Sequence, residues 1–377
     1  MSKGKVVVAM SGGVDSSVAA LLLMEEGYEV VGVTMKLYDL DGDRLSPTYR
    51  GCCTADDAED ARRVCHRLGV PHYVFNMQEQ FRAFVMDYFV REYQRGRTPN
   101  PCLACNEKLK FSFLLQRALM LDAEYVATGH YARIAPNGHG LPPLRGGGRR
   151  LLKGLDASKD QSYVLYTLGQ AELAHTLLPV GWHAKEEVRR LARQAGLSNA
   201  DKPDSQEICF IPSGDYRQFL AQRLEQRPGD IVDSQGNVLG RHGGVHAFTV
   251  GQRKGLGLSA ARPLFVTRID AERDLVVVGP EEELYAEAIV ASRVRYVSGR
   301  PPEGPVVVAA KIRYRTAEAA AVLHPQGERA VLRFGQPQRA VAPGQAVVFY
   351  QGEDVLGGGT IEEAMPSPSV GVSIGSD

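Results

Sequence analysis

The sequence predicts an α/β protein in which a parallel-sheet domain is followed by a small middle domain and a C-terminal β-barrel. Strand-like apolar runs alternate with amphipathic helix-like runs up to about residue 212, a pattern typical of a parallel sheet wrapped by helices. The glycine-rich heptapeptide SGGVDSS joins the first of these strands to the first helix. From residue 229 to residue 363, short alternating runs bounded by Gly, Pro or Asp indicate all-β structure.

Hydrophobic periodicity defines the elements of the first domain. Strands are expected at residues 5–10, 28–37, 72–75 and 124–128, and helices at residues 14–26, 54–68, 78–95, 105–120 and 185–195. Thr54 is expected to cap the second helix. Residues 136–150 (PNGHGLPPLRGGGRR) break the periodicity and predict a mobile loop. The domains are therefore expected at residues 1–212, 213–282 and 283–364, followed by a disordered tail at residues 365–377.

The composition is that of an ordinary globular protein with balanced charge. The 377 residues include 44 basic and 44 acidic side chains, so a nucleic-acid partner would have to be recognised by local patches. The N-terminus lacks a secretory signal and no stretch approaches the roughly 20 apolar residues of a membrane span, which predicts a cytoplasmic protein without membrane contact. Reduced thiols are the rule in that compartment, so the six cysteines are better suited to chemistry, metal binding or packing than to permanent disulfides.

The heptapeptide at residues 11–17 has the properties of a phosphate-binding loop. Its two glycines let backbone N–H groups curl around an anion, its three serines add hydroxyl donors, and the following helix contributes the positive end of its dipole. Asp15 would repel a phosphate unless Mg²⁺ lay between them, which indicates a metal-bound pyrophosphate. The loop is neither a Walker A motif nor GxGxxG. A tight turn without a ligand is the alternative, but the complete motif between strand and helix favours a nucleotide.

This motif resembles that of the PP-loop ATP pyrophosphatases, which have the adenine nucleotide alpha hydrolase-like fold. The resemblance implies cleavage of ATP to AMP and pyrophosphate by adenylation of an oxygen, with ATP and Mg²⁺ as cofactors. It also implies a set of nucleotide contacts from the loop and from the ends of two further strands: Ala9, Met10, Ser11, Gly12, Gly13, Val14, Asp15, Ser16, Met35 and Gly129.

Seven further segments specify the substrate. They are GCC at residues 51–53, TPNPCLACN at 98–106, DAEYVATGHY at 122–131, KDQSY at 159–163, KPDSQEICF at 202–210, GQRKGLG at 251–257 and GQAVVFY at 344–350. In this order they resemble the bacterial tRNA-specific 2-thiouridylase family along nearly the whole chain. The resemblance implies 2-thiolation of the wobble uridine, in which adenylation of uridine O2 precedes attack by sulfur on C2.

The resemblance assigns the sulfur chemistry to two cysteines. Cys209 matches the family's persulfide carrier, and Cys105 matches the catalytic cysteine that resolves the persulfide through a transient disulfide with Cys209. Cys105 is expected at a helix start near Lys108 and Lys110, where a thiol pKa would be depressed. Cys65 lies on an apolar helix face and is interpreted as a packing residue.

Cys102 leaves an alternative open. Relatives carry Asp or Cys there, so an acid–base role cannot be transferred to a thiol. Its C-x-x-C spacing from Cys105 also suits metal or redox chemistry. An iron–sulfur cluster held by Cys102, Cys105 and Cys209 is therefore the rival to the persulfide, which the resemblance favours.

The resemblance also implies a set of tRNA contacts: Asn100, Pro101, Cys102, His130, Lys159, Asp160, Gln161, Arg313, Tyr314 and Gln345. A buried structural histidine is the alternative for His130. Lys311, Arg313 and Arg315 alternate with apolar residues, so a strand would place the three charges on one face. Arg145, Arg149 and Arg150 would add charge to the mobile loop at residues 136–150.

The predicted partners are tRNA and a sulfur donor such as a cysteine desulfurase or a sulfur relay protein. Two other classes of protein are the alternatives. A PP-loop ligase or amidotransferase acting on a small molecule would leave Cys105 and Cys209 unexplained. A non-catalytic RNA-binding or ATP-sensing module would not turn over ATP.

Overall fold

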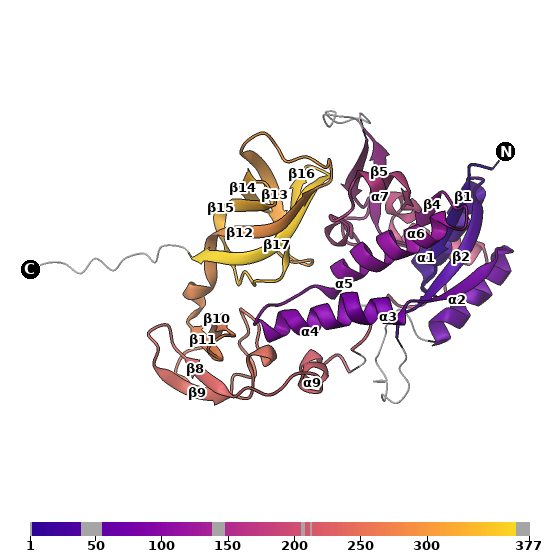
Figure 1. Cartoon of the computed structure of the whole chain (residues 1–377). Coiled ribbons are helices and arrows are strands. Elements are labelled where there is room, and N and C mark those ends of the chain that lie inside the picture. The colour runs from indigo at the N-terminus through magenta and orange to yellow at the C-terminus, as the bar shows by residue number, and fades with distance from the viewer. Residues whose placement is uncertain (1, 39–54, 138–147, 205–207, 212, 367–377) are drawn as a thin grey trace, which may run out of the picture.

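The computed structural model describes residues 2–38, 55–137, 148–204, 208–211 and 213–366. Three sheets organise these residues, and Figure 1 shows them as a parallel-sheet domain on one side, a barrel on the other, and a small four-stranded sheet below the barrel. This is the predicted fold class: an α/β domain, a small middle domain and a C-terminal β-barrel. The GCC segment at residues 51–53, Thr54, Arg145 and the end of the tail lie outside the described residues.

The N-terminal sheet has the strand order β3-β2-β1-β4-β7, and all its pairings are parallel. Its strands are β1 (Lys5–Ala9), β2 (Glu29–Lys36), β3 (His72–Asn76), β4 (Tyr125–Ala127) and β7 (Thr176–Leu177). The chain proceeds from β1 through β2 to β3 on one side and returns through β4 to β7 on the other. The strand order therefore reverses between β1 and β4, which is where open α/β sheets bind ligands.

Alternate residues of the central strand point to opposite faces of the sheet, and a separate core covers each face. Val6 and Val8 of β1 pack with α1 (Val14–Glu25), α2 (Ala55–Leu68) and α8 (Lys185–Gln194). Val7 and Ala9 face the second core, which contains the aromatic side chains of Phe81, Phe89 and Phe210. Such near-continuous burial explains why these strands read as unbroken apolar runs.

The two long helices of the second core each contain π-helical turns. The first runs through α3 (Gln78–Phe81), η1 (Arg82–Met86) and α4 (Asp87–Gln94), and the second through α5 (Pro101–Ala104), η2 (Cys105–Leu114) and α6 (Leu115–Leu119). The predicted start of the second helix at residue 105 is wrong. Asn100 caps it by accepting a hydrogen bond from the Cys102 N–H, and Pro101 occupies the first turn, where its missing N–H costs nothing.

The predicted mobile loop is flanked by a β-hairpin. β5 (Ala132–Pro136) and β6 (Arg149–Lys153) are antiparallel, and β6 joins the barrel sheet where Leu152 is opposite Asp354. The prediction therefore fails at Pro136, Arg149 and Arg150, which lie in strands, and residues 138–147 lie outside the described residues. The hairpin connects the parallel-sheet domain to the barrel.

The remaining elements form the middle domain and the barrel. The middle sheet has the order β10-β11-β8-β9 and contains β8 (Gly229–Val232), β9 (Val238–His242), β10 (Phe265–Asp270) and β11 (Leu275–Gly279), preceded by α9 (Tyr216–Ala221). The barrel is antiparallel and closes through the pairing of β12 with β17. Its strands are β12 (Tyr285–Tyr296), β13 (Val306–Lys311), β14 (Ala319–Gln326), β15 (Arg329–Arg339), β16 (Ala346–Gln351) and β17 (Asp354–Pro366). The short helices are η3 (Ser162–Val164), α7 (Gln170–Ala174), η4 (Pro179–Trp182), η5 (Val245–Ala247) and η6 (Glu281–Leu284).

Candidate active site

Hydrogen bonds from its own serine side chains brace the glycine-rich loop between β1 and α1. The Ser16 hydroxyl accepts a hydrogen bond from the Ser11 N–H (3.2 Å) and donates one to the Gly13 carbonyl (3.1 Å). The Ser17 hydroxyl donates to the same carbonyl at 2.9 Å. The N–H groups of the first helical turn have no intrahelical acceptor, so they are available to an anion placed in the loop.

Two glycines at this loop are required by close backbone contacts. Gly12 has φ +69°, and a Cβ at this position would lie 2.3 Å from the Asp57 carbonyl oxygen. A Cβ on Gly129, just after β4, would lie 2.5 Å from the Ser16 nitrogen. The ends of β1 and β4 thus pack directly together at the point where the strand order reverses, and most of the nucleotide-binding residues expected from the sequence meet there. Met35 is buried near the end of the neighbouring strand β2.

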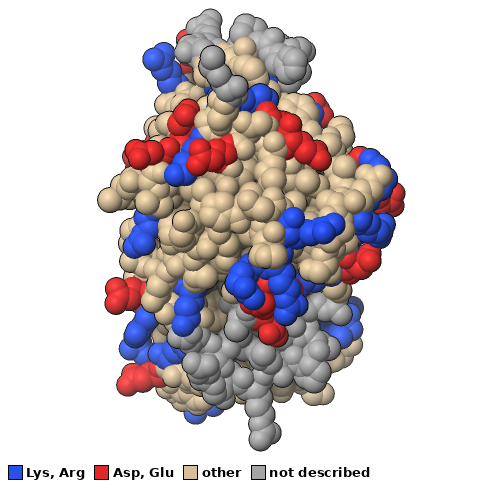
Figure 2. Space-filling model, turned by 90° about the vertical axis from the view of Figure 1, so that its right-hand side faces the viewer, with Lys and Arg blue, Asp and Glu red and all other residues tan. Residues whose placement is uncertain are grey.

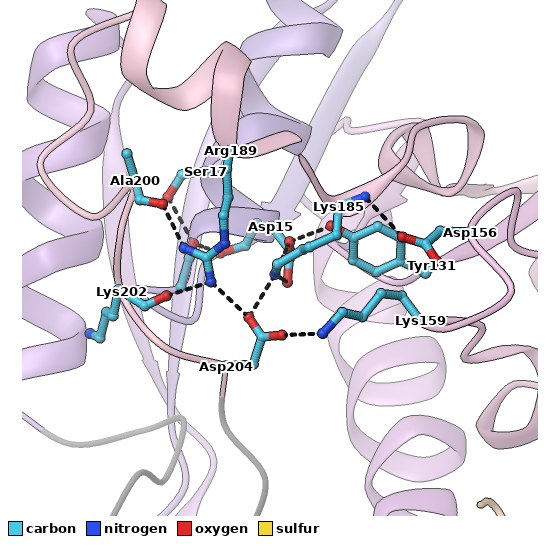
Figure 3. A network of polar contacts seen from close by, with 12 residues as sticks. Asp15, Ser17, Tyr131, Asp156, Lys159, Lys185, Arg189, Ala200, Lys202 and Asp204 are labelled. Atoms are coloured by element: carbon cyan, nitrogen blue, oxygen red, sulfur yellow. Dashed lines mark hydrogen bonds and ion pairs between the residues drawn. The ribbon is translucent and has the colours of Figure 1, made fainter. Parts of the chain in front are cut away.

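A network of charged side chains surrounds Asp15 (Figure 3). The Lys185 ammonium lies 2.8 Å from both Asp15 carboxylate oxygens and 2.7 Å from Asp204. The Tyr131 hydroxyl donates to Asp15 at 2.7 Å, and both burial and the nearby carboxylate raise the pKa of Tyr131, which keeps it a neutral donor. Asp15 is therefore compensated by a cation and a hydroxyl on the open side of the loop.

Asp204 joins the nucleotide loop to the segment that contains Lys159. Its second carboxylate oxygen lies 2.8 Å from the Lys159 ammonium, and Arg189 approaches Asp204 at 3.3 Å. Burial opposes ionisation of Asp204, but hydrogen bonds from Lys159 and Lys185 hold its pKa below the usual range. The negative charge of Asp204 is thus retained at neutral pH between three cations.

Two residues near the C-terminal end of the domain hold the loop and the neighbouring helix α2 in place. The Asn199 amide donates to the Gly12 carbonyl (3.0 Å) and to the Ser17 hydroxyl (2.9 Å). Lys202 bonds Asp57 (2.8 Å) and Asp60 (2.6 Å) of α2. Burial opposes charge on Lys202, but these two carboxylates raise its pKa. Sequence reasoning missed Asn199 and the roles of Lys185 and Lys202, although Lys202 opens the recognised KPDSQEICF segment.

The cysteines occupy distinct environments. Cys65 is fully buried in the core against α1, and burial raises its pKa to about 11, which agrees with its interpretation as a packing residue. Cys105 and Cys209 are partly buried and pack against the same core cluster, the one that contains Phe81 and Phe210. Cys102 is exposed. The four cysteines in the described part of the chain are thiols, with no disulfide among them.

The position of Cys105 differs from the expectation. Because the helix begins at Pro101, Cys102 lies in its first turn and Cys105 lies one turn further on, at the start of the π-helical stretch η2. Lys108 pairs with Glu107 at 2.9 Å, so its charge is partly compensated. The helix start expected at Cys105 is therefore occupied by Cys102 instead.

The segment that leads into this helix is held by the barrel. The Thr98 N–H donates to the Pro343 carbonyl, and the Gln345 amide donates to the Thr98 carbonyl, both at 2.8 Å. Gly344 lies so close that a Cβ there would be 2.9 Å from the Thr98 nitrogen. Gln345 thus positions the chain just before Asn100, Pro101 and Cys102.

The other residues expected to contact tRNA lie around the same junction. Tyr314 is half-buried, and its pKa is raised by burial and then by Asp160 and Cys102 beside it. Gln161 accepts a hydrogen bond from the Tyr131 N–H at 2.9 Å, and Asp160 accepts one from the Gly154 N–H at 3.0 Å. The segments around residues 102, 160 and 314 therefore converge at the junction of the two domains.

His130 lies inside the domain. Its side chain bonds the Thr128 hydroxyl at 2.7 Å, and burial, followed by the nearby Lys110 charge, lowers its pKa well below the usual value. The imidazole is therefore neutral and covered in this structure.

The basic strand face expected near residue 313 does not form. β13 ends at Lys311, and residues 313–315 lie in the following turn. The charges of Lys311, Arg313 and Arg315 therefore do not share a strand face. Lys311 approaches Asp160 at 3.6 Å and Glu318 at 3.8 Å, and Arg313 donates inward to the Ala340 carbonyl.

The charges expected in the mobile loop are also partly withdrawn from solvent. Arg150 is 2% exposed and forms a two-bond pair with Asp354 of the barrel, one bond measuring 2.6 Å. Arg149 is part of β6, where its N–H donates to Gln170 at 2.7 Å. Arg150 therefore joins the barrel to the hairpin and is not available to a phosphate in this structure.

Within the described ranges of the chain no group of three or more His, Cys, Asp or Glu side chains is arranged to hold a metal ion. No helix in the same ranges combines the length and the apolar character that crossing a membrane requires.

The parallel sheet with its glycine-rich loop, the small middle sheet and the closed barrel define the chain as a HUP-domain nucleotide-binding protein with two appended β-domains. Three family models match it in order. The tRNA methyl transferase HUP domain matches residues 4–213, the tRNA methyl transferase PRC-barrel domain matches 217–280, and the aminomethyltransferase beta-barrel domain matches 286–361.

Relatives along the full length identify the family. The tRNA-specific 2-thiouridylase MnmA of Symbiobacterium thermophilum is 52% identical over 96% of this chain and 93% of its own length. That of Roseiflexus sp. is 50% identical over 95% of this chain and 99% of its own. The U34-tRNA thiolase NcsA from Methanococcus maripaludis, a solved structure, aligns at a TM-score of 0.34 with 16% identity over 59% of this chain and 68% of that chain. The chain belongs to the tRNA-specific 2-thiouridylase family of enzymes.

Proposed function

We propose that this enzyme uses ATP to adenylate O2 of the wobble uridine of tRNA and then replaces that oxygen with sulfur. Membership of the 2-thiouridylase family carries this proposal, and the glycine-rich loop supplies its nucleotide site. O2 attacks the α-phosphorus of ATP, the bond to the bridging oxygen breaks, and pyrophosphate leaves with the electron pair. The uridine C2 then carries AMP, a much better leaving group than the original carbonyl oxygen.

The residues around the loop fit a metal-bound pyrophosphate. Ser11 and Ser16 lie beside the backbone N–H groups that would contact phosphate oxygens, and Asp15 is the carboxylate that would hold Mg²⁺. When bound there, Mg²⁺ would neutralise charge on the leaving pyrophosphate. In this structure the Asp15 carboxylate is paired with the Lys185 ammonium, so Mg²⁺ would share or replace this partner.

Sulfur transfer is assigned to Cys209 and Cys105. The outer sulfur of a Cys209 persulfide attacks C2, and AMP departs. The Cys105 thiolate then attacks Sγ of Cys209, the sulfur–sulfur bond breaks, and the sulfur stays on the base. A Cys105–Cys209 disulfide remains, and a thiol reductant resets it. Packing of both cysteines against one core cluster supports this pairing.

The remaining assignments follow the same proposal. The donor that charges Cys209 is a cysteine desulfurase or a sulfur relay protein. Asn100, Pro101 and Cys102 contact the target base, and residues 159–161, His130, Arg313, Tyr314 and Gln345 contact tRNA. The domain boundaries at residues 212, 282 and 364 and the cytoplasmic location stay predictions.

Mass spectrometry of tRNA nucleosides after incubation with ATP, Mg²⁺ and a persulfide donor tests this function. Cys105→Ser and Cys209→Ser should each stop formation of 2-thiouridine while adenylation of the uridine, measured as pyrophosphate release, survives. Cys102→Ser should have a mild effect. Cys65→Ala is the matched control, because Cys65 is buried on the other side of the sheet, and it should retain thiolation.

The iron–sulfur alternative makes a different prediction for the same variants. A cluster held by Cys102, Cys105 and Cys209 would make all three substitutions equally severe, and activity would track bound iron. Iron quantitation on anaerobically purified protein therefore decides between the two mechanisms. Near-stoichiometric iron that follows activity would overturn the persulfide proposal.

A further inference from the structure

The middle domain contains an acid-free stretch with a strong local excess of positive charge. Between residues 234 and 269 the sequence has no Asp or Glu, although the whole chain is neutral. Its cations are all exposed: Arg241, Arg253, Lys254, Arg262 and Arg268. By contrast, the face of the molecule in Figure 2 mixes cations with carboxylates.

Four of these cations have no counterion in the described part of the chain. Arg241 approaches Asp230 at 3.4 Å, but no described carboxylate pairs with the other four. Exposed cations without partners repel one another, and a polyanion would relieve that repulsion. Cations on an ordinary solvated surface are commonly paired with nearby carboxylates. The unpaired cations of this stretch are instead typical of a surface that binds a polyanion.

Residues 251–257, which we call the basic loop, present two of these cations on a fixed turn. Its three glycines, Gly251, Gly255 and Gly257, have φ between +70° and +88°, which larger residues rarely adopt. Gln252 braces the turn by accepting from the Thr249 N–H (3.1 Å) and donating to the Lys254 carbonyl (3.0 Å). Arg253 and Lys254 thus project from a defined backbone.

A cavity of about 390 Å³ lies beside the basic loop. Arginines, histidines and glycines contribute to its lining, among them Arg217, Arg241, His242, His246, Gly244 and Gly255. Burial lowers the pKa of both histidines, so the charge at neutral pH comes from the arginines. The glycines leave backbone at the surface, which allows close approach of a phosphodiester chain.

The basic loop is continuous with the proposed tRNA site. A Cβ on Gly251 would lie 2.6 Å from the Ala340 Cβ and 3.9 Å from the Arg313 guanidinium. Arg313 itself bonds the Ala340 carbonyl, and the same barrel segment reaches Thr98 through Gln345. A nucleic acid that contacts Arg313 therefore passes next to the basic loop.

We propose that the basic loop and the adjacent cavity bind the phosphate backbone of the substrate tRNA, away from the target base. This inference rests on the proposed function for the identity of the RNA. RNA is favoured over an acidic protein because Phe248 and Leu256 turn inward, leaving cations and glycine backbone on the loop surface. Contacts of this kind position a nucleic acid without reading its sequence.

The double variant Arg253→Ala/Lys254→Ala tests the proposal. We expect weaker binding of full-length tRNA and a slope of log affinity against log salt that is shallower by about 2, since each lost phosphate contact removes roughly one released counterion. Arg273→Ala is the matched control. It removes an exposed cation of the same domain, but Arg273 lies among Asp270, Glu272 and Asp274, so the slope should not change.

The outcomes separate this proposal from its rivals and from the proposed function. If the double variant has the wild-type slope of log affinity against log salt, the proposal that the basic loop binds RNA is refuted. Unchanged tRNA binding combined with slower sulfur delivery from a protein donor also overturns it, in favour of an acidic protein partner. A third outcome is that the double variant has the shallower salt slope while the wild-type enzyme forms no 2-thiouridine. In that case the proposed function fails, but the proposal that the basic loop binds RNA stands.

Discussion

Replacing Lys185 with methionine tests whether the ion pairs around Asp15 stabilise the nucleotide-binding domain. The Lys185 side chain is 8% exposed and contacts both Asp15 and Asp204. Methionine fills similar space without the charge, so Asp15 would retain only the Tyr131 hydroxyl. Removing one partner of a buried ion pair costs roughly 3–5 kcal/mol. Because Asp15 and Asp204 are 29% and 27% exposed, we expect the lower end, about 3 kcal/mol.

The single tryptophan of the chain reports on this region. Trp182 lies in η4, three residues before Lys185, so its fluorescence follows unfolding of the same domain. A loss of about 3 kcal/mol should lower Tm by roughly 6–12 °C in a domain of this size. Mg²⁺ and ATP should restore part of the loss, because Mg²⁺ at Asp15 would replace the missing cation.

Arg190→Met is the matched control for this measurement. Arg190 lies on the same helix but is 52% exposed and pairs with the surface residue Glu187, so its removal should leave stability close to that of the wild type. Equal losses for the two variants, or a loss below about 1 kcal/mol for Lys185→Met, would refute the reasoning that burial makes the Lys185 pairs strong.

Four other outcomes are expected. Asp15→Ala and Ser16→Ala should abolish adenylation, measured as pyrophosphate release, while tRNA affinity in a filter assay stays close to wild type; an equal loss of binding would refute the separation of the two sites. Arg313→Ala should flatten the salt dependence of tRNA binding, and an unchanged slope would show that Arg313 only braces Ala340. Fluorescence of 2-aminopurine beside the target uridine should rise on binding, because C2 is inaccessible in a stacked base; a constant signal would indicate a base that is already exposed. Alkylation mapped by mass spectrometry at pH 8 should modify exposed Cys102 and spare Cys65, whose pKa burial raises to about 11; early modification of Cys65 would mean that this core opens readily.

The nucleotide loop was predictable from sequence because its chemistry is contiguous. Strand, glycine turn and helix start follow one another within residues 5–17, and periodicity alone identifies the flanking elements. The partners of the loop were not predictable in this way. Lys185 and Asn199 contact the loop although they lie more than 160 residues further along the chain. In the sequence, one is the first residue of a predicted helix and the other follows that helix, and nothing in the local pattern links either residue to the loop.

The errors at Arg150 and Arg313 have a common physical cause. Glycine- and arginine-rich sequence beside a loop indicates exposed charge, but burial of an arginine depends on an acceptor that only the tertiary structure supplies. Asp354 of β17 provides it for Arg150, whereas Arg313 stays half-buried and donates to the Ala340 carbonyl. The local pattern was therefore wrong about the exposure of Arg150 and about the strand at Arg313.

The segment that carries the proposed persulfide is anchored at Asp204 and at Phe210. On one side, Asp204 is tied through Lys185 to Asp15 of the nucleotide loop. On the other, Phe210 is buried among the aromatic side chains of the core against which Cys105 also packs. Cys209 lies five positions after Asp204, and a fully extended chain of that length spans no more than about 18 Å. The ion pair at Asp204 and the packing of Phe210 therefore keep Cys209 within about 18 Å of Asp204 and against the core that Cys105 also contacts, which is compatible with the proposed transfer of sulfur between the two cysteines.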